Sequence, residues 1–214
     1  MTDMTKFGAE ANREIPRRTR KSASDRKAEI LQTTLDLAFE VGPNHVTTGM
    51  IAGKLGLTQP ALYKHFPKKG DIWGAIADQL GQRVGANIAR VTSTTTDPLE
   101  RIRLLILGHL QLIIDTPALP EIMVMRDASA NHSMVQSAIQ TRMTDFRGAL
   151  VGAVIAAIET GSFRRDIAPK DAETLIFGVI QSLVLRLMIT RNTAILLEDG
   201  PRLLDLQLSG FAKS

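Results

Sequence analysis

The chain has 214 residues, of which 44% are hydrophobic and 22% charged, as in a folded globular protein of one large or two small domains. It contains no cysteine, which excludes disulfides, thiol nucleophiles and thiolate metal sites. The net charge is +4, and the whole positive excess lies in residues 1–75. This distribution indicates either a segment that binds a polyanion or an ordinary solvated tail.

Residues 1–24 are expected to form a flexible basic arm, because they lack helical periodicity, contain Pro16 and carry a cluster of arginines. Nonspecific attraction to phosphate is the simpler interpretation of the arm. From Asp25 onward, apolar residues recur at three- and four-residue spacing. They predict a helix capped by Ser24 or Asp25 that ends at GPNH, residues 42–45.

The next segment has the pattern of a helix-turn-helix. Thr47 is expected to cap a short helix, Gly56 to turn the chain, and Thr58 to cap a second short helix. Pro60 fits the first turn of that helix, because its missing N–H would have no partner within the helix there. Leu62 is expected to face the first helix together with Phe66. This leaves a polar and aromatic surface opposite, formed by Gln59, Pro60, Tyr63 and Lys64, with Ala61 and His65 at its edges.

The remainder reads as helix throughout, so the predicted fold class is all-α. Helices are expected over residues 71–91, 99–115, 131–159 and 171–191, with a short segment around Met123 and a last helix beginning near Pro201. The 171–191 helix is apolar on more than one face. Such a helix is either central in a large core or shared with a second chain.

The segment VTTGMIAGKLGLTQPALYKHFPKKGDIW, residues 46–73, resembles the DNA-binding domain of the TetR-family transcriptional regulators. The resemblance implies a three-helix DNA-binding domain over residues 25–70 and a larger helical ligand-binding and dimerisation domain over residues 71–214. One position departs from the pattern: Gly49 stands where some relatives carry a base-reading arginine, so the operator is not predicted from relatives.

The resemblance also implies roles for individual residues. Gln59, Pro60 and Ala61 would face base edges, and Lys64 could reach either guanine or a phosphate. Their chemistry agrees, since glutamine can pair with adenine and apolar groups can contact the thymine methyl. Hydroxyl, imidazole and ammonium groups suit phosphate. The full set of expected DNA-binding residues is Thr47, Thr48, Thr58, Gln59, Pro60, Ala61, Tyr63, Lys64, His65 and Lys69.

In the larger domain, we expect a cavity for a small, largely apolar or amphipathic effector with one polar or acidic end. Its expected residues are His109, Met123, Arg126, Phe146, Phe177 and Gln181. The alternative for His109 is a hydrogen-bonded core histidine, and for the methionines gap-filling in the core. A homodimer is expected through a four-helix bundle of the last two helices, with Ile176, Ile180, Leu183, Leu187, Leu204 and Leu208 at the interface.

Together these observations predict a sequence-specific DNA-binding regulator, most simply a repressor released from a pseudo-palindromic operator when an effector binds. The alternative is a DNA-binding scaffold regulated by a protein partner. We expect no enzymatic activity, since no GxSxG, HExxH, P-loop or GxGxxG motif is present, and no metal or cofactor. No apolar stretch supplies the ~20 uninterrupted residues of a membrane span, and no signal peptide is recognised, so a soluble cytoplasmic protein is expected.

Overall fold

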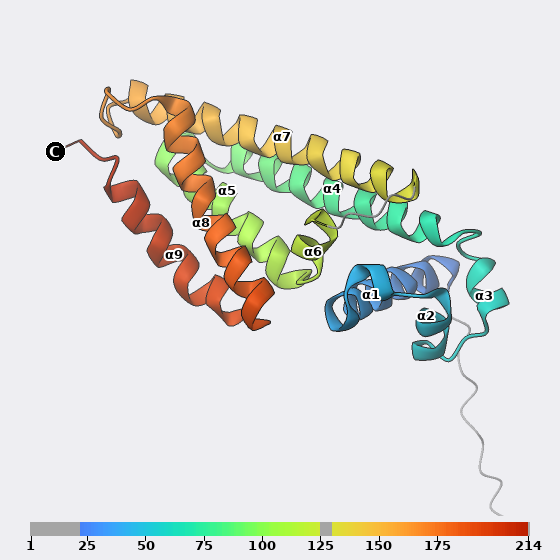
Figure 1. The fold of residues 1–214 in the computed structure, drawn as a ribbon. Helices are drawn as coiled ribbons and strands as arrows, with labels where there is room; N and C mark the ends of the chain where they lie inside the picture. Colours follow the sequence, from blue (N-terminus) through green and yellow to red (C-terminus); the bar gives the residue numbers. More distant parts are fainter. Residues whose placement is uncertain (1–21, 125–129, 214) are drawn as a thin grey trace, which may run out of the picture.

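The computed structural model describes residues 22–124 and 130–213, and within these ranges the chain is helical, with one isolated bridge between Phe163 and Ala212. The predicted all-α fold class is confirmed. Figure 1 shows a small domain of short helices at one end of an elongated bundle, with one long helix running from the first into the second.

The small domain is built from helices α1 (Ala23–Val41), α2 (Thr48–Lys54) and α3 (Gln59–Tyr63), with a single 3-10 turn over Pro43–His45. Its apolar residues meet in one core to which each helix contributes, including Ile30, Ala38, Val46, Ile51 and Leu62. The cap of α1 was predicted wrongly: the hydroxyl of Ser22 accepts the N–H of Asp25 at 3.0 Å, so the helix is capped two or three residues earlier than expected. Asp25 itself lies in the first turn, where a carboxylate suits the helix dipole.

Helix α4 (Lys69–Thr94) joins the two parts of the molecule. Its first turns bury Ile72, Trp73 and Ile76 beside the small domain, and its later turns run along α7 (Ala130–Glu159). At 26 residues it is about 39 Å long. A single helix therefore belongs to both cores.

The larger domain adds α5 (Pro98–Asp115), α6 (Leu119–Val124), α8 (Pro169–Thr190) and α9 (Ala194–Ser209) to α4 and α7. Helix α5 is central, contacting α4, α7 and α9, and Asp97 caps it as expected by accepting the N–H of Leu99 at 3.2 Å. Helices α8 and α9 lie side by side along the far side of the bundle (Figure 1).

The last helix was predicted to begin near Pro201, but α9 starts at Ala194 and carries Pro201 in its interior. A proline inside a helix leaves the carbonyl four residues earlier without a partner. That residue is Leu197, which is exposed like Pro201 itself, so the unpaired carbonyl lies on the solvent side. The neighbouring Gly200 is buried, and an added Cβ there would lie 2.6 Å from the Leu110 side chain. The close approach of α9 to α5 therefore stabilises the helix across its proline.

Helix α8 is, among the described helices, the one long and apolar enough to cross a membrane by length and composition. Central helices of folded bundles meet the same criterion. Here the buried face of α8 includes Glu173, which is 1% exposed and accepts two hydrogen bonds from Arg147 of α7, at 2.7 and 2.8 Å. This hydrogen bond raises the pKa of Arg147. An ionised pair that ties α8 to α7 fits a bundle core.

Candidate DNA-binding surface and effector cavity

Helices α2 and α3 are fixed by two threonine caps, as predicted. The Thr47 hydroxyl accepts the N–H of Met50 at 3.2 Å, and the Thr58 hydroxyl accepts the N–H of Ala61 at 3.3 Å. Between the helices, the N–H of Leu57 donates to the carbonyl of Ala52 at 2.8 Å and closes the turn at Gly56, whose φ of 63° is costly for other residues. The two helices are thus held at a defined angle.

Leu62 and Phe66 anchor α3 to the rest of the small domain, as expected, being 0% and 6% exposed. Lys27 of α1 lies 5.6 Å from the centre of the Phe66 ring. With these side chains buried, the opposite face of α3 is directed outward. Its exposed residues are Gln59, Pro60, Tyr63 and Lys64, while Ala61 and His65 are half-buried.

A hydrogen-bonding contact at 3.2 Å joins the hydroxyl groups of Thr48 on α2 and Tyr63 on α3. It holds the Tyr63 hydroxyl at a fixed position, although the ring is 40% exposed. Thr48 is half-buried, whereas Thr47 and Thr58 are exposed at the starts of their helices. These contacts bring the hydroxyls of α2 and α3 onto one surface.

Gly49 lies directly against Gln59. A Cβ placed on Gly49 would be 3.0 Å from the Gln59 side-chain nitrogen, tighter than nearly all real Cβ contacts. The glycine therefore leaves the space that the Gln59 amide occupies over the first turn of α2. The sequence alone showed Gly49 only as a missing arginine, and the contact with Gln59 could not be read from it.

Lys69, the last of the predicted DNA-binding residues, is half-buried at the start of α4. The N–H of Lys68 donates to the Asp71 carboxylate at 2.9 Å and fixes this turn. The start of a helix favours an anion through its free N–H groups and its dipole. All ten predicted residues thus lie on α2 or α3, directly beside their ends, or at the start of α4, and none has a fully buried side chain.

Residues 30–81 match the sequence model of the bacterial regulatory proteins, tetR family. The small domain thus carries the sequence pattern of the tetR-family regulatory proteins. This confirms the resemblance seen in residues 46–73, and the matched region covers α2, α3, most of α1 and the first half of α4.

Curated relatives include the nucleoid occlusion factor SlmA of Vibrio vulnificus (strain YJ016), 32% identical over 101 residues, which are 47% of this chain and 52% of the relative. The chain thus spans about half the length of the curated relatives it matches. Among solved structures, a TetR-family regulator from Agrobacterium tumefaciens matches with a TM-score of 0.71 and 18% identity, over 90% of this chain and 100% of that one. The regulator FadR from Bacillus subtilis in complex with stearoyl-CoA matches with a TM-score of 0.62 and 19% identity, over 86% and 98%. These structural matches show that the TetR fold extends beyond the DNA-binding domain.

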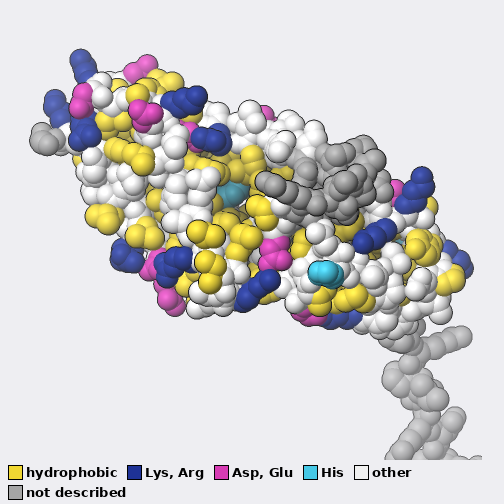
Figure 2. Space-filling model, viewed as in Figure 1, with side chains coloured by type: hydrophobic (Ala, Val, Ile, Leu, Met, Phe, Trp, Pro, Cys, Tyr) yellow, Lys and Arg dark blue, Asp and Glu magenta, His cyan; other side chains and the backbone are white. Residues whose placement is uncertain are grey.

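In the larger domain, a cavity of about 220 Å³ opens between α5, α6, α7 and α8. Figure 2 shows hydrophobic side chains around the hollow in this region. Four of the predicted effector-binding residues line it: His109, Met123, Phe177 and Gln181. Phe146 lies behind His109 instead of lining the cavity, with ring centres 4.7 Å apart. Arg126 lies outside the described residues.

The prediction missed several apolar lining residues, namely Ile113, Leu119, Pro120, Val124, Met143, Ile180 and Val184. Helical spacing in the sequence could have identified the lining residues of α5 and of α8. Ile113 follows His109 by four residues on α5, and Ile180 and Val184 follow Phe177 by three and seven on α8, so each group shares one helical face. Ile180 had been assigned to the dimer interface.

His109 is 5% exposed, and burial lowers its pKa to about 4, so the imidazole is neutral at pH 7. The alternative expectation was a hydrogen-bonded core histidine. Among the described side chains we find no hydrogen-bond partner for either ring nitrogen, and the ring lines the cavity. Its contact with protein is instead the tilted stack on Phe146.

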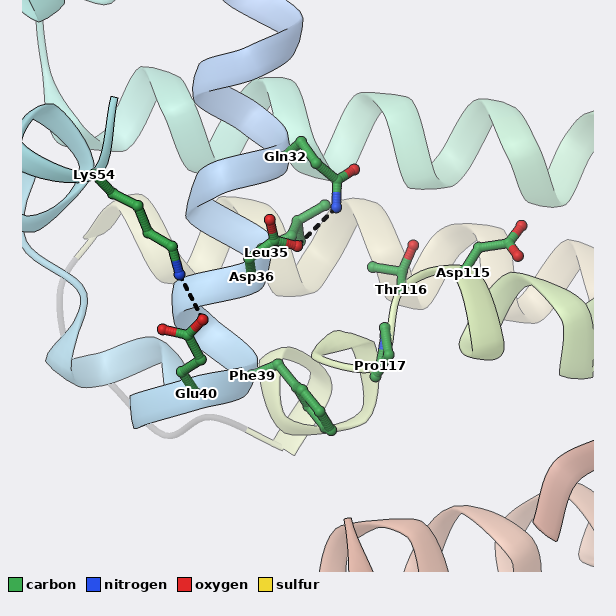
Figure 3. A pocket seen from close by; sticks show the side chains of 9 residues that line it. All are labelled: Gln32, Leu35, Asp36, Phe39, Glu40, Lys54, Asp115, Thr116 and Pro117. Atoms are coloured by element: carbon green, nitrogen blue, oxygen red, sulfur yellow. Dashed lines mark hydrogen bonds and ion pairs between the residues drawn. The ribbon is translucent and has the colours of Figure 1, made fainter. Parts of the chain in front are cut away.

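A second cleft, of about 270 Å³, separates α1 from the turn between α5 and α6 (Figure 3). Its charged residues are already paired: Lys54 with Glu40 at 2.5 Å, Asp36 with the amide of Gln32 at 2.9 Å, and Asp115 with Arg83. Figure 3 shows Phe39 and Pro117 on opposite sides of the opening. The cleft therefore marks the boundary between the DNA-binding domain and the larger domain.

The six residues predicted at the dimer interface lie in the core of a single chain. Ile176, Ile180, Leu183, Leu187, Leu204 and Leu208 are each at most 5% exposed without a second copy. They pack α8 and α9 against the bundle within one chain. The apolar side chains left exposed on these helices are Leu175, Leu185, Ile189, Leu197 and Leu206, which are 53–73% exposed.

Proposed function

We propose that the protein is a sequence-specific DNA-binding transcriptional regulator. The observation that carries this proposal is the outward face of α3, where Gln59, Pro60 and Tyr63 are presented by a helix whose Leu62 and Phe66 are buried. A helix of this kind can enter the major groove with its first residues at the base edges.

The residues have distinct roles in the proposal. The Gln59 amide reads adenine, and Pro60 and Ala61 contact a thymine methyl group. Phosphates are bound by Tyr63, His65, Lys69 and Thr47, and these contacts set the position of α3 along the groove. Thr48 holds the Tyr63 hydroxyl in place, and Thr58 adds a further hydroxyl at the start of α3. Lys64 is placed to reach either guanine or phosphate.

The test is selection of randomised duplex DNA by the purified protein and by two variants. Gln59→Ala should loosen the selected motif at one base position per half-site, at a cost of about 1–3 kcal/mol for that base. Tyr63→Phe should weaken binding to all sequences alike, because a phosphate contact carries no base information. Salt-sensitive binding with no enriched motif would overturn the proposal.

The proposed active form is a homodimer. The exposed side chains Leu175, Leu185 and Ile189 lie along one stripe of α8, together with Gly178 and Ser182, at spacings of three and four residues. Leu197 and Leu206 extend this apolar surface onto α9. Two copies that join through it would present two α3 helices, and the operator would then contain two half-sites about one helical turn, ~34 Å, or a multiple of it apart.

The regulator is proposed to respond to a small, largely apolar effector in the cavity beside His109. The cavity lies between helices that also contact α4, and α4 continues into the DNA-binding domain. Ligand binding would favour a spacing of the two α3 helices that does not fit the operator. The Bacillus subtilis FadR structure provides one case of this fold in complex with a ligand that carries a long acyl chain, stearoyl-CoA.

A second candidate is a DNA-binding scaffold whose larger domain meets a protein partner. It is favoured by the curated relatives, which are named nucleoid occlusion factors. Operator affinity measured with and without a bound small molecule separates the two functions. Tight ligand binding that leaves operator affinity unchanged, together with capture of a protein by the operator-bound form, would support the scaffold.

A further inference from the structure

The described lining of the effector cavity is apolar apart from two groups. Of its eleven described residues, nine are aliphatic, aromatic, proline or methionine, and the remaining two are His109 and Gln181. His109 is buried on α5, whereas Gln181 is exposed on α8. A ligand in this cavity meets one hydrogen-bonding group at depth and a second where the cavity opens.

Among the described side chains, the buried group, His109, has no hydrogen-bond partner. A neutral imidazole offers one N–H donor and one nitrogen acceptor, and no described residue is within hydrogen-bonding distance of either. Stacking on Phe146 and packing in the cavity wall fix the ring but leave its nitrogens unused. A buried polar group without a partner is unfavourable, so a ligand that supplies one regains that free energy.

The described charged residues near the cavity are already paired. No described lining residue is ionised at pH 7. Arg147, which lies 5.2 Å from the centre of the Phe177 ring, directs two hydrogen bonds to the buried Glu173. Arg142, which lines a small adjoining void, pairs with Asp145 at 3.4 Å. A carboxylate or ammonium group placed beside His109 would therefore lose its hydration, and the described lining of the cavity offers it no unpaired counter-ion.

From these observations we infer that the effector is an apolar molecule whose buried end carries an uncharged hydrogen-bonding group, such as an alcohol, a ketone or an ester, bound by His109. The inference rests on the proposed effector response and specifies its ligand class. It replaces the broader expectation of a polar or acidic end.

The test is calorimetric titration of the full-length protein at pH 7.5 with four probes of one chain length: 1-octanol, 2-octanone, octanoate and octylamine. The two neutral probes should bind at least about tenfold more tightly than the two charged ones. This difference is expected because a neutral probe gains a hydrogen bond to His109 and does not have to remove a charged group from water. Equal or tighter binding of octanoate would overturn the inference. A preference for octanoate that disappears in Arg126→Ala would assign an acidic end to the effector instead.

Three variants test the role of His109. His109→Phe keeps an aromatic ring against Phe146 and should lower 1-octanol affinity about tenfold, whereas His109→Gln restores a donor and an acceptor and should recover most of it. Gln111→Ala, on the exposed side of α5 and outside the cavity lining, should leave affinity nearly unchanged. Unchanged 1-octanol binding in a folded His109→Phe protein would overturn the inference.

The calorimetry needs no DNA, so it can fail or succeed separately from the proposed function. If 1-octanol binds through His109 but leaves affinity for the selected duplex unchanged, the ligand class stands and the proposed effector response fails. If no duplex is selected at all, DNA reading fails while the binding result remains valid.

Discussion

Arg191 donates a hydrogen bond from Nη1 to the carbonyl oxygen of Phe39 at 3.2 Å, joining residues 152 positions apart. Its guanidinium also lies 5.1 Å from the centre of the Phe39 ring and pairs with Glu121 of α6. Phe39 belongs to α1, and Arg191 caps the C-terminal end of α8. One side chain therefore links the DNA-binding domain to the two helices that form much of the cavity wall.

Arg191 has a backbone φ of 57°, the one described non-glycine residue with positive φ. Arg191→Gly would remove the side chain without adding backbone strain, because glycine readily adopts this conformation. We expect faster amide hydrogen exchange at the C-terminal end of α1, where the N–H of Gly42 donates to Ala38, with little change in the α5 core.

The matched control for this experiment is Arg202→Gly, since Arg202 is exposed and pairs with Asp199 on its own helix. It should leave exchange in α1 unchanged. Equal exchange in α1 for the wild type and Arg191→Gly would show that this contact does not hold the DNA-binding domain.

Gly49→Ala should shift the Gln59 amide, because the new Cβ would lie 3.0 Å from its nitrogen. We expect altered base preference at the one position that loosens in Gln59→Ala, with little loss of overall affinity. In the Gln59→Ala background, Gly49→Ala should have no further effect on that position. Duplex selection with the two single variants and the double variant measures this coupling, and independent effects would refute it.

Two charged substitutions on α8 distinguish residues of the proposed dimer interface from residues of the core of one chain. Ile189→Lys, at a side chain 73% exposed, should give a folded monomer with weak operator binding. Leu183→Asp, at a side chain 0% exposed, should instead unfold the chain, since a buried unpaired charge costs several kcal/mol. Light scattering and circular dichroism distinguish these results. Folded dimers of the Ile189→Lys protein would place the interface elsewhere.

His109 should make stability depend on pH. Its pKa is about 4 when folded and near 6.5 when unfolded, so between these values the unfolded state binds more protons. Stability should therefore fall by roughly 2–3 kcal/mol as pH drops from 7.5 to 4.5, through this residue alone. Urea unfolding at both pH values should show a smaller fall in His109→Phe by about that amount. An identical fall in both proteins would contradict the burial of a neutral imidazole.

The small domain could be predicted closely because its structure is set by local chemistry. Thr47 and Thr58 cap their helices, and Pro60 occupies a first turn, through contacts within three or four residues. The larger domain depends on packing between distant segments. Periodicity showed that α8 is apolar on several faces, but only the positions of α5, α7 and α9 decide that Leu183 is buried and Leu185 exposed.

The same limit explains the errors at α9 and in the cavity. Pro201 is a reliable helix start in isolation, and it is tolerated inside α9 because of how that helix packs on α5. Leu119 and Pro120 line the cavity because of where α6 lies, which no spacing in the sequence specifies.

The contact between Gly49 and Gln59 has a consequence for the divergence of such regulators. If Gln59 contacts a base of the operator, the residue at position 49 sets the position of the Gln59 amide without itself touching DNA. Any larger residue at position 49 would then change the base preference of Gln59. The two positions would then be inherited as a pair, and a mutation at one would select for changes at the other. Descendants of this protein that acquire new target genes should differ at both.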